Sequence, residues 1–248
     1  MTAIRTAVIL AAGMGTRLKD YTEERPKGFL EIDGSTLIDR SIKALLDHGI
    51  TNIIIGTGHF HEQFDLLKGS YPGITTMRNV DYAVTGSMYT LYVVRELIKD
   101  SFLLLESDLL YDQAALDLLL LDAKKDIVLA SSATNSGDEV YIQHSPKAFL
   151  ENMSKDKTLL SHIDGELVGI SKLSRAALNA MIAFAEPAFD RGSRKMNYED
   201  AMVGAASNYN IFIKVIQDLA WCEIDDENHL ARALATVYPK ILERMNNP

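Results

Sequence analysis

The chain has 248 residues, of which 47% are hydrophobic and 24% are charged, a composition that excludes a fibrous or disordered protein. Asp and Glu outnumber Lys and Arg by 34 to 25, which gives a formal net charge of -9. A chain this acidic has no bulk positive field for a nucleic-acid backbone, so we expect no nucleic-acid partner. Any anionic small ligand must instead be held by a few cations and by backbone N–H groups.

The single cysteine, Cys222, excludes an internal disulfide and any multi-cysteine metal site. Residues 1–13 lack the form of a secretory signal, and no segment reaches the roughly 18 apolar residues of a membrane span. We therefore expect a cytoplasmic protein without membrane insertion. A chain of this length can bury one large core, so we expect residues 1–248 to form a single domain. The sequence leaves the oligomeric state open, a homo-oligomer included.

The first half of the chain alternates between short apolar runs and amphipathic stretches. An apolar run over residues 6–10 predicts a buried strand, which leads into a loop of small residues over 11–16. Further strands are predicted over 52–56, 75–78, 102–106 and 126–130, and helices over 36–48, 62–68, 88–99 and 113–121. This alternation is typical of βαβ units and predicts an α/β fold around a mainly parallel sheet.

The second half of the chain is less regular. Strands are predicted over 140–143, 167–171, 211–216 and 221–224, a helix over 175–185, and another helix at the end of the chain. Pro239 should kink or divide this last helix, because proline cannot donate the helical hydrogen bond.

The loop after the first strand holds Gly13 and Gly15 close to Arg17, and a Pro-Lys pair ending in Lys27 follows. A dinucleotide-binding fingerprint would need a third glycine where Leu18 stands, and the Gly-Lys-Ser/Thr of a P-loop is absent. A plain tight turn explains the glycines but not the arginine. We interpret the segment as a loop whose N–H groups wrap a nucleoside triphosphate, with the two cations on its phosphates.

The stretch LAAGMGTRL over 10–18, followed by RPKGFLEIDGSTLI over 25–38, resembles the signature of the nucleotidyltransferases that make sugar nucleotides and CDP-alcohols. The resemblance covers nearly the whole chain and is weakest over 133–164. It implies a Rossmann-like three-layer nucleotidyltransferase fold with a mixed, mainly parallel central sheet. It also implies that an acceptor oxyanion attacks the α-phosphorus of the triphosphate and expels pyrophosphate. The loop residues it assigns to the nucleotide are Leu10, Ala11, Ala12, Gly13, Gly15, Thr16, Arg17 and Lys27.

Such a reaction depends on positioning the reactants and on neutralising phosphate charge with cations and Mg²⁺. Two apolar runs end in acids at the family's metal-binding positions, Asp108 and Asp225. The resemblance implies that these two aspartates hold Mg²⁺ and complete a catalytic set with Arg17 and Lys27. Asp226 is the alternative to its neighbour as ligand, and helix N-capping is the competing role for any of these aspartates.

Asn79, Gly86 and Ser87 match positions where relatives contact the base and ribose. The competing interpretation is a plain helix start that Ser87 caps. The choice of CTP over UTP rests on the resemblance.

Two further segments, GSMYTL over 86–91 and WCEIDD over 221–226, resemble the branch of the family that uses CTP with small amino-alcohol phosphates or phosphonates. Within it, the best match is to the enzymes acting on 2-aminoethylphosphonate, and the rivals act on phosphocholine or phosphoethanolamine. Lys155 matches a lysine that relatives place against the acceptor's phosphate, although it could equally be a solvated surface residue. The product would be an activated headgroup for attachment to a lipid or glycan.

The cationic end of the acceptor corresponds to Tyr198, Glu199 and Asp200. A quaternary ammonium is usually held by an aromatic cage, whereas a primary ammonium needs oxygen acceptors. Two acids with one tyrosine therefore favour the primary amine, with Asp200 the preferred contact and Glu199 the alternate. The competing role for both acids is to begin a helix and favour its dipole. A non-catalytic nucleotide-binding regulatory subunit is the other functional class, but the full catalytic set argues against it.

Overall fold

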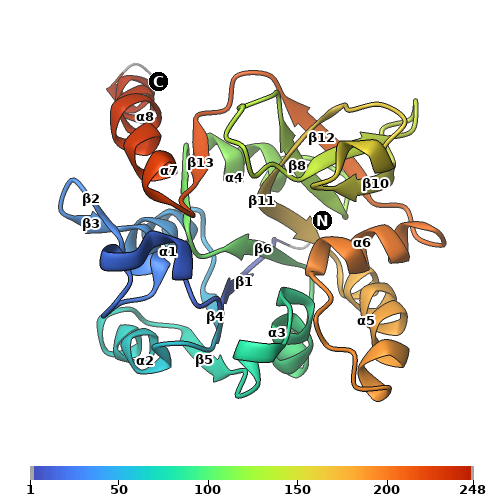
Figure 1. Ribbon diagram of the computed structural model, residues 1–248, viewed down its shortest axis with the longest axis horizontal. Helices are drawn as coiled ribbons and strands as arrows, with labels where there is room; N and C mark the ends of the chain where they lie inside the picture. Colours follow the sequence, from blue (N-terminus) through green and yellow to red (C-terminus); the bar gives the residue numbers. More distant parts are fainter. Residues whose placement is uncertain (1–2, 247–248) are drawn as a thin grey trace.

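The computed structural model describes residues 3–246, and a nine-stranded mixed sheet forms its centre (Figure 1). Seven strands follow the order β10-β9-β11-β6-β1-β4-β5, while β8 pairs with β11 and β12 pairs with β8. Neighbours among β6, β1, β4 and β5 are parallel, and β11 is antiparallel to β6, β8 and β9. The strands are β1 (Thr6–Ala11), β4 (Asn52–Thr57), β5 (Ile74–Arg78), β6 (Phe102–Glu106), β8 (Ile127–Ser131), β9 (Tyr141–His144), β10 (Leu150–Ser154), β11 (Gly165–Leu173) and β12 (Phe212–Ile216).

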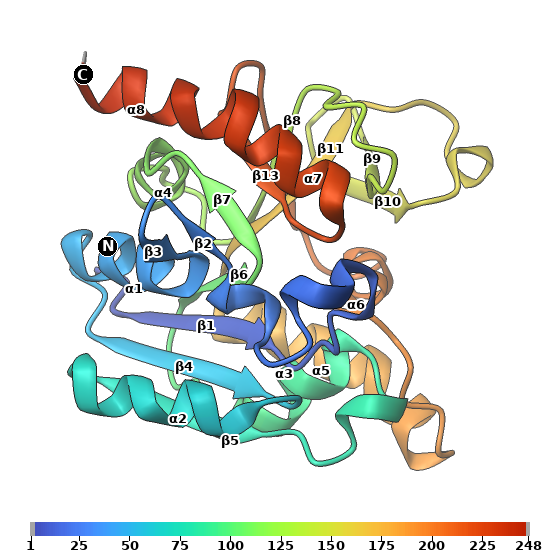
Figure 2. The same cartoon turned by 60° about the vertical axis from the view of Figure 1, so that its left-hand side comes forward.

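Helices cover both faces of this sheet (Figures 1 and 2). Along β1, Val8 and Leu10 pack into the core on one face, and Ala7 and Ile9 pack into the core on the other. A strand buried on both faces needs apolar residues at every position, which explains the continuous apolar run. The first face is covered by α3 (Ser87–Val94), α5 (Arg175–Asp190) and α6 (Tyr198–Ala206), and the second by α1 (Leu37–Asp47), α2 (His61–Ser70) and α4 (Ala114–Leu120).

A third, smaller core joins the end of the chain to its beginning. It contains Leu18 and Leu30 from the start of the chain together with Ile224 and Leu230 from the end. Figure 2 shows α7 and α8 lying beside β13 and β7. The elements around this core are β2 (Glu31–Ile32), β3 (Ser35–Thr36), β7 (Leu109–Tyr111), β13 (Trp221–Glu223), α7 (Glu227–Arg232) and α8 (Tyr238–Asn246).

The predicted α/β fold with a mixed sheet is confirmed, and so is the division of the last helix. A π-helical turn over Ala233–Val237 separates α7 from α8, immediately before Pro239. Within residues 3–246 no helix combines the length and the apolar character that crossing a membrane requires.

Two helix predictions were wrong in their extent. The helix expected over 88–99 ends at Val94 and continues only as a short 3-10 turn. The helix expected over 175–185 continues through Pro187 to Asp190, because Phe189 packs edge-on against Tyr89 and Tyr92 and keeps the last turn on the core. The elements β2, β3, β7 and β10 were not predicted, and a helix at the place of α6 was considered only as the competing role of Glu199 and Asp200. Most are too short to show a period, and β7 pairs with β13, which lies far along the chain.

Candidate active site

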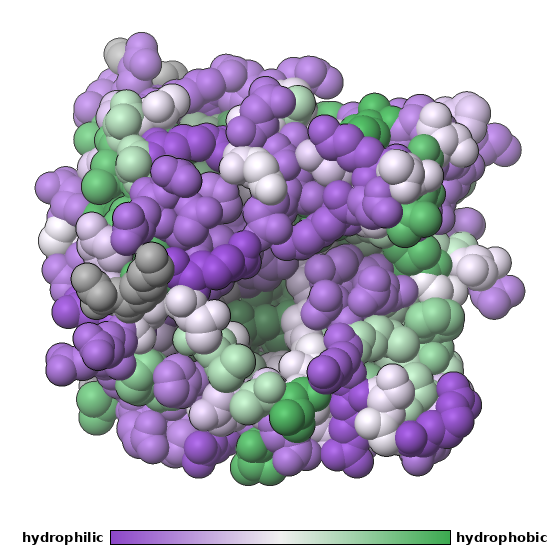
Figure 3. Space-filling model, viewed as in Figure 1, coloured by the Kyte–Doolittle hydropathy of each residue, from purple (hydrophilic) through white to green (hydrophobic). Residues whose placement is uncertain are grey.

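A cavity of about 320 Å³ opens beyond the carboxyl ends of β1 and β6, where ligands bind in open α/β sheets. The space-filling view shows a hollow in the middle of this face (Figure 3). The parts of the chain that line the cavity include the loop after β1, the start of α3, the loop after β6, the loop between β8 and β9, and the start of α6. Its volume falls within the range of small-ligand sites.

Leu10, Ala11, Ala12 and Gly13 line the cavity, whereas Gly15, Thr16 and Arg17 lie outside the described lining. The loop turns back at Gly15, which has a φ of 66° that favours glycine. A Cβ atom at this position would lie 3.1 Å from Cγ of Lys27. The glycine thus lets the loop pack directly against the lysine.

The four residues of the predicted catalytic set lie together. Nζ of Lys27 donates to Oδ2 of Asp108 at 3.0 Å and also to Oδ1 of Asp225. Nη2 of Arg17 donates to Oδ2 of Asp225 at 2.7 Å, so that one buried carboxylate, 1% exposed, meets both cations. The backbone assists, because the N–H of Ile224 donates to the carbonyl of Asp108 at 3.0 Å and joins the ends of the two acidic strands.

The structure divides the two neighbouring aspartates between two roles. Asp225 faces Lys27, whereas Asp226 caps α7 by accepting a hydrogen bond from the backbone N–H of His229 at 2.9 Å. The capping role considered from the sequence is thus the one that Asp226 has.

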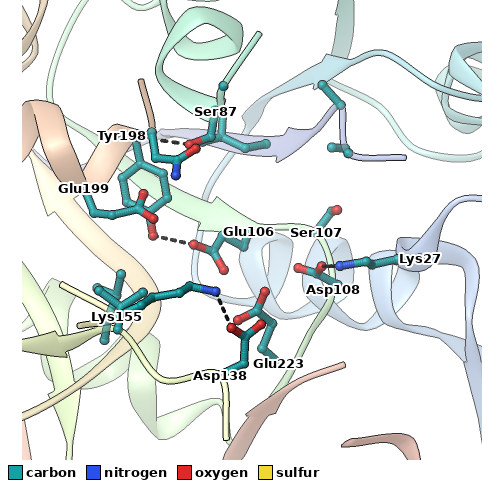
Figure 4. Close-up of a pocket in the computed structure, with 18 of the residues that line it drawn as sticks. Lys27, Ser87, Glu106, Ser107, Asp108, Asp138, Lys155, Tyr198, Glu199 and Glu223 are labelled. Carbon is teal, nitrogen blue, oxygen red and sulfur yellow. Dashed lines mark hydrogen bonds and ion pairs between the residues drawn. The ribbon is translucent and has the colours of Figure 1, made fainter. Parts of the chain in front are cut away.

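Two glutamates that the sequence interpretation missed lie beside Asp108. Ligand atoms of Glu106, Asp108 and Glu223 lie within 4.8 Å of one another (Figure 4). Both glutamates stand two positions before an aspartate of the set, at Glu106-Ser107-Asp108 and Glu223-Ile224-Asp225. Because alternate residues of a strand share a face, this repeated acid-x-acid spacing was the available signal.

These glutamates hold their protons more tightly than usual. Burial, with the nearby charges of Asp108 and Glu199, raises the pKa of Glu106 to about 8. Burial and the charge of Glu106 likewise raise the pKa of Glu223 well above its ordinary value. The hydroxyl of Tyr198 donates to Oε1 of Glu106 at 2.5 Å (Figure 4) and fixes that carboxylate in place. The cluster is therefore poised to receive a cation, whose charge would favour ionisation.

Glu199 and Asp200 point in different directions, and of the two Glu199 lines the cavity, whereas Asp200 was the contact preferred from the sequence. The carboxylate of Asp200 accepts a hydrogen bond from the backbone N–H of Asn197 at 2.9 Å and completes a capping box at the start of α6. Glu199 lines the cavity, as does Tyr198, and its Oε2 atom is buried without a hydrogen-bond partner. Burial, together with the neighbouring charge of Asp200, raises the pKa of Glu199 to about 7.

Lys155 also lines the cavity and is paired with a further acid that the sequence interpretation missed. Its Nζ donates to Oδ1 of Asp138 at 2.6 Å, and Arg17 donates to the other oxygen at 2.5 Å. Although partial burial opposes ionisation, the two cations hold the pKa of Asp138 below its ordinary value. Asp138 is thus paired with Arg17 and Lys155, the two cations that were expected to bind the phosphates of the two substrates.

The expected base and ribose contacts lie at the junction of α3 and α6. Gly86 and Ser87 line the cavity, and Asn79 does not. A Cβ atom at Gly86 would lie 2.2 Å from the carbonyl of Met196, so only glycine lets these segments approach. The hydroxyl of Ser87 accepts a hydrogen bond from the N–H of Tyr198 at 2.9 Å.

The amide of Asn79 is buried and donates to Thr85 and Thr90 at 2.9 and 3.0 Å. It therefore shapes the segment before Gly86 rather than facing the cavity.

The burial of Glu199 predicts a pH-dependent change in stability. The unfolded chain ionises this carboxyl near its ordinary pKa of 4.5, whereas the folded state keeps the proton until about pH 7. The free energy of unfolding must therefore fall as the pH rises through this window. Glu199→Gln should remove that fall and raise the free energy of unfolding by about 2 kcal/mol above pH 7, with little effect below pH 4.5. Urea unfolding at pH 4.5 and pH 8 measures the difference.

The matched control for this prediction is Asp200→Ala. Loss of the capping box should lower the free energy of unfolding by about 1 kcal/mol rather than raise it. Equal effects of the Glu199 variant at both pH values would contradict the burial argument.

Comparison with known proteins places this chain in a family. The model of the MobA-like NTP transferase domain matches residues 7–177. A solved structure of the CTP:phosphocholine cytidylyltransferase from Streptococcus pneumoniae superposes with a TM-score of 0.75 at 25% identity, covering 98% of this chain and 100% of that one.

Curated relatives agree with this placement. The choline-phosphate cytidylyltransferase of Streptococcus pneumoniae is 42% identical over 98 residues, which is 40% of this chain and 42% of that protein. The CMP-5'-(3-aminopropyl)phosphonate synthase of Streptomyces rubellomurinus is 27% identical over 89% of this chain and 37% of its own length. The 2-aminoethylphosphonate cytidylyltransferase of Lancefieldella rimae is 30% identical over 38% of each chain.

These alignments span about two fifths of each curated relative. The family model, by contrast, covers most of the present chain, from the first strand to the start of α5. The chain therefore belongs to the MobA-like NTP transferase family.

Proposed function

We propose that the protein is a cytidylyltransferase that moves CMP from CTP to 2-aminoethylphosphonate and releases pyrophosphate. The observation that carries the acceptor assignment is the buried, unpaired oxygen of Glu199 in a cavity that also contains Glu106 and Glu223. Relatives that are named for phosphonate and choline-phosphate acceptors support the reaction class. The product is an activated headgroup, ready for transfer to a lipid or glycan.

On the nucleotide side, the chain would contribute positioning and positive charge. The loop over 10–13 and Lys27 line the cavity, Arg17 stands beside it, and both cations are paired with aspartates. The phosphates of a bound triphosphate would replace the aspartates as partners of these cations. The cations would then stabilise negative charge on the triphosphate. The acceptor's phosphonate is already largely ionised near neutral pH, so no general base is required.

Asp108 and Asp225 fit a magnesium ion by their chemistry. One carboxylate oxygen of each aspartate accepts a hydrogen bond from Nζ of Lys27, so the two oxygens lie close together. Mg²⁺ prefers such carboxylate ligands together with substrate phosphates. Bound there, Mg²⁺ would supply further neutralisation of phosphate charge. The chain's own part is to hold the two carboxylates close together, through the buried position of Asp225 and its pairing with Arg17.

On the acceptor side, the cavity suits a primary ammonium. Such a group donates three hydrogen bonds, and Glu106, Glu199 and Glu223 offer acceptors for them. Tyr198 lines the same region, but its hydroxyl is held on Glu106, so it supports a carboxylate. Lys155 would bind the phosphonate at the other end once it is released from Asp138. Phosphoethanolamine shares this chemistry and is the nearest alternative substrate.

A pyrophosphate-release assay with CTP and Mg²⁺ tests the proposal on four acceptors, 2-aminoethylphosphonate, phosphoethanolamine, phosphocholine and the amine-free ethylphosphonate. We expect pyrophosphate release to be fastest with 2-aminoethylphosphonate. Glu199→Gln should raise the KM for the amine-bearing acceptors about tenfold, the value of one charge-assisted hydrogen bond, and leave ethylphosphonate nearly unaffected.

Fastest pyrophosphate release with phosphocholine would overturn the primary-amine assignment, but the assignment of a cytidylyl-transfer reaction would stand. CTP binding without pyrophosphate release on any acceptor would favour the regulatory subunit instead.

A further inference from the structure

His229, on α7, uses both of its ring nitrogens to connect two parts of the site. The backbone N–H of Asp225 donates to Nδ1 at 3.3 Å, and Nε2 lies 3.2 Å from the carbonyl oxygen of Ser136. The residue is 5% exposed and lines the cavity. These two partners are 89 residues apart in the chain, from 136 to 225, so the contact exists only in the fold.

The partners determine where the ring proton lies. An amide N–H can only donate, so Nδ1 must carry the lone pair, and a carbonyl can only accept, so Nε2 must carry the hydrogen. His229 is therefore held as the Nε2–H tautomer. A residue that only filled space would not need to match a donor on one side and an acceptor on the other.

Each partner controls a different half of the site. Asp225 pairs with Lys27 and Arg17 on the nucleotide side. Ser136 belongs to the loop over 132–140 between β8 and β9, here called the strap, which lines the acceptor side. The strap also carries Asp138, which pairs with Lys155. The imidazole thus connects the backbone of Asp225 directly to the backbone of the strap, while Arg17 bridges the side chains of Asp225 and Asp138.

We propose that His229 is a positioning residue that aligns Asp225 with the strap, so that nucleotide and acceptor meet in one geometry. The inference rests on the proposed function for its kinetic consequences but not for its structural ones. The Nδ1 contact sets the position of the Asp225 carboxylate. The Nε2 contact sets the position of the strap on the acceptor side of the cavity.

Two conservative substitutions separate these contacts. In His229→Asn the amide oxygen can stand where Nδ1 stood and still accept from Asp225, but the reach to Ser136 is lost. In His229→Gln the longer amide can still donate to Ser136, but no acceptor remains at the place of Nδ1. We expect the Asn variant to keep the wild-type kcat and to raise the KM for the acceptor about tenfold. The Gln variant should lower kcat about tenfold and keep the wild-type KM for the acceptor. His229→Ala should show both losses.

Two measurements do not depend on activity. The ¹⁵N chemical shifts of the His229 ring should show the Nε2–H tautomer. Hydrogen exchange of the strap should speed up in the Ala and Asn variants but not in the Gln variant. His48→Asn is the control, because this half-buried histidine contacts the carbonyl of Ala44 within its own helix region and should change only the melting temperature.

The Nδ1–H tautomer, or strap exchange unchanged in the Ala variant, would overturn the proposal. So would Asn and Gln variants with the same kinetic defect. If the wild type releases no pyrophosphate with any acceptor, the proposed function fails, and the tautomer and exchange results alone decide the role of His229.

Discussion

Replacement of Lys27 by alanine is expected to lower turnover about 100- to 1000-fold, the usual cost of losing one preorganised charge donor. Lys27 donates to Asp108 and Asp225 at once and packs against the turn at Gly15. Its ammonium is the cation nearest to both carboxylates, and no other described lysine contacts either of them. Without it, phosphate charge that develops during transfer would lose its principal protein partner.

The fold should survive this substitution. Arg17 still pairs with Asp225 at 2.7 Å, and divalent cations in the assay buffer can neutralise the remaining carboxylate. Circular dichroism and thermal melting check this point, and Lys43→Ala, at an exposed position on α1, is the matched control. Near-normal turnover in the Lys27 variant would contradict the assignment of the whole site.

Asp225→Asn should have an effect of similar size, about 100-fold on turnover, and should raise the Mg²⁺ concentration needed for half-maximal rate. The substitution keeps the shape of a side chain that is 1% exposed but removes the charge that meets Lys27 and Arg17. Pyrophosphate release measured across a Mg²⁺ titration reports both effects.

The neighbouring variant Asp226→Asn is the control for this experiment. Asparagine caps helices as well as aspartate does, so the bond to the N–H of His229 should persist and activity should stay near that of the wild type. A larger loss of activity in Asp226→Asn than in Asp225→Asn would show that Asp226, and not Asp225, has the catalytic role.

Much of the fold and part of the site followed from local patterns. The apolar run over 6–10 and the alternation that follows it predicted the α/β core, because strands buried on both faces must be apolar throughout. The glycines and cations of the first loop and the acids at two strand ends pointed to the residues around Lys27, because short motifs report chemistry that one segment carries by itself. The repeated acid-x-acid spacing at Glu106 and Glu223 was equally local and could have been used.

Other features were decided by tertiary structure. Glu199 and Asp200 differ in role because a helix begins at Tyr198. Asp200 stands three residues after the N-cap Asn197 and returns to the cap, whereas Glu199 lines the cavity. Asp138 lies in the segment where the family resemblance was weakest, and its partners Arg17 and Lys155 come from other elements.

The sequence by itself determined which chemistry the chain carries, because residue type and local spacing set the donors, acceptors and charges that are available. Only the tertiary structure decided which of these groups share one cavity. Asp225 and Lys27 are 198 residues apart, and their contact depends on the third core, where Leu18 packs with Ile224. Burial at the cavity and neighbouring carboxylates, rather than any motif, raise the pKa of Glu106 and Glu199.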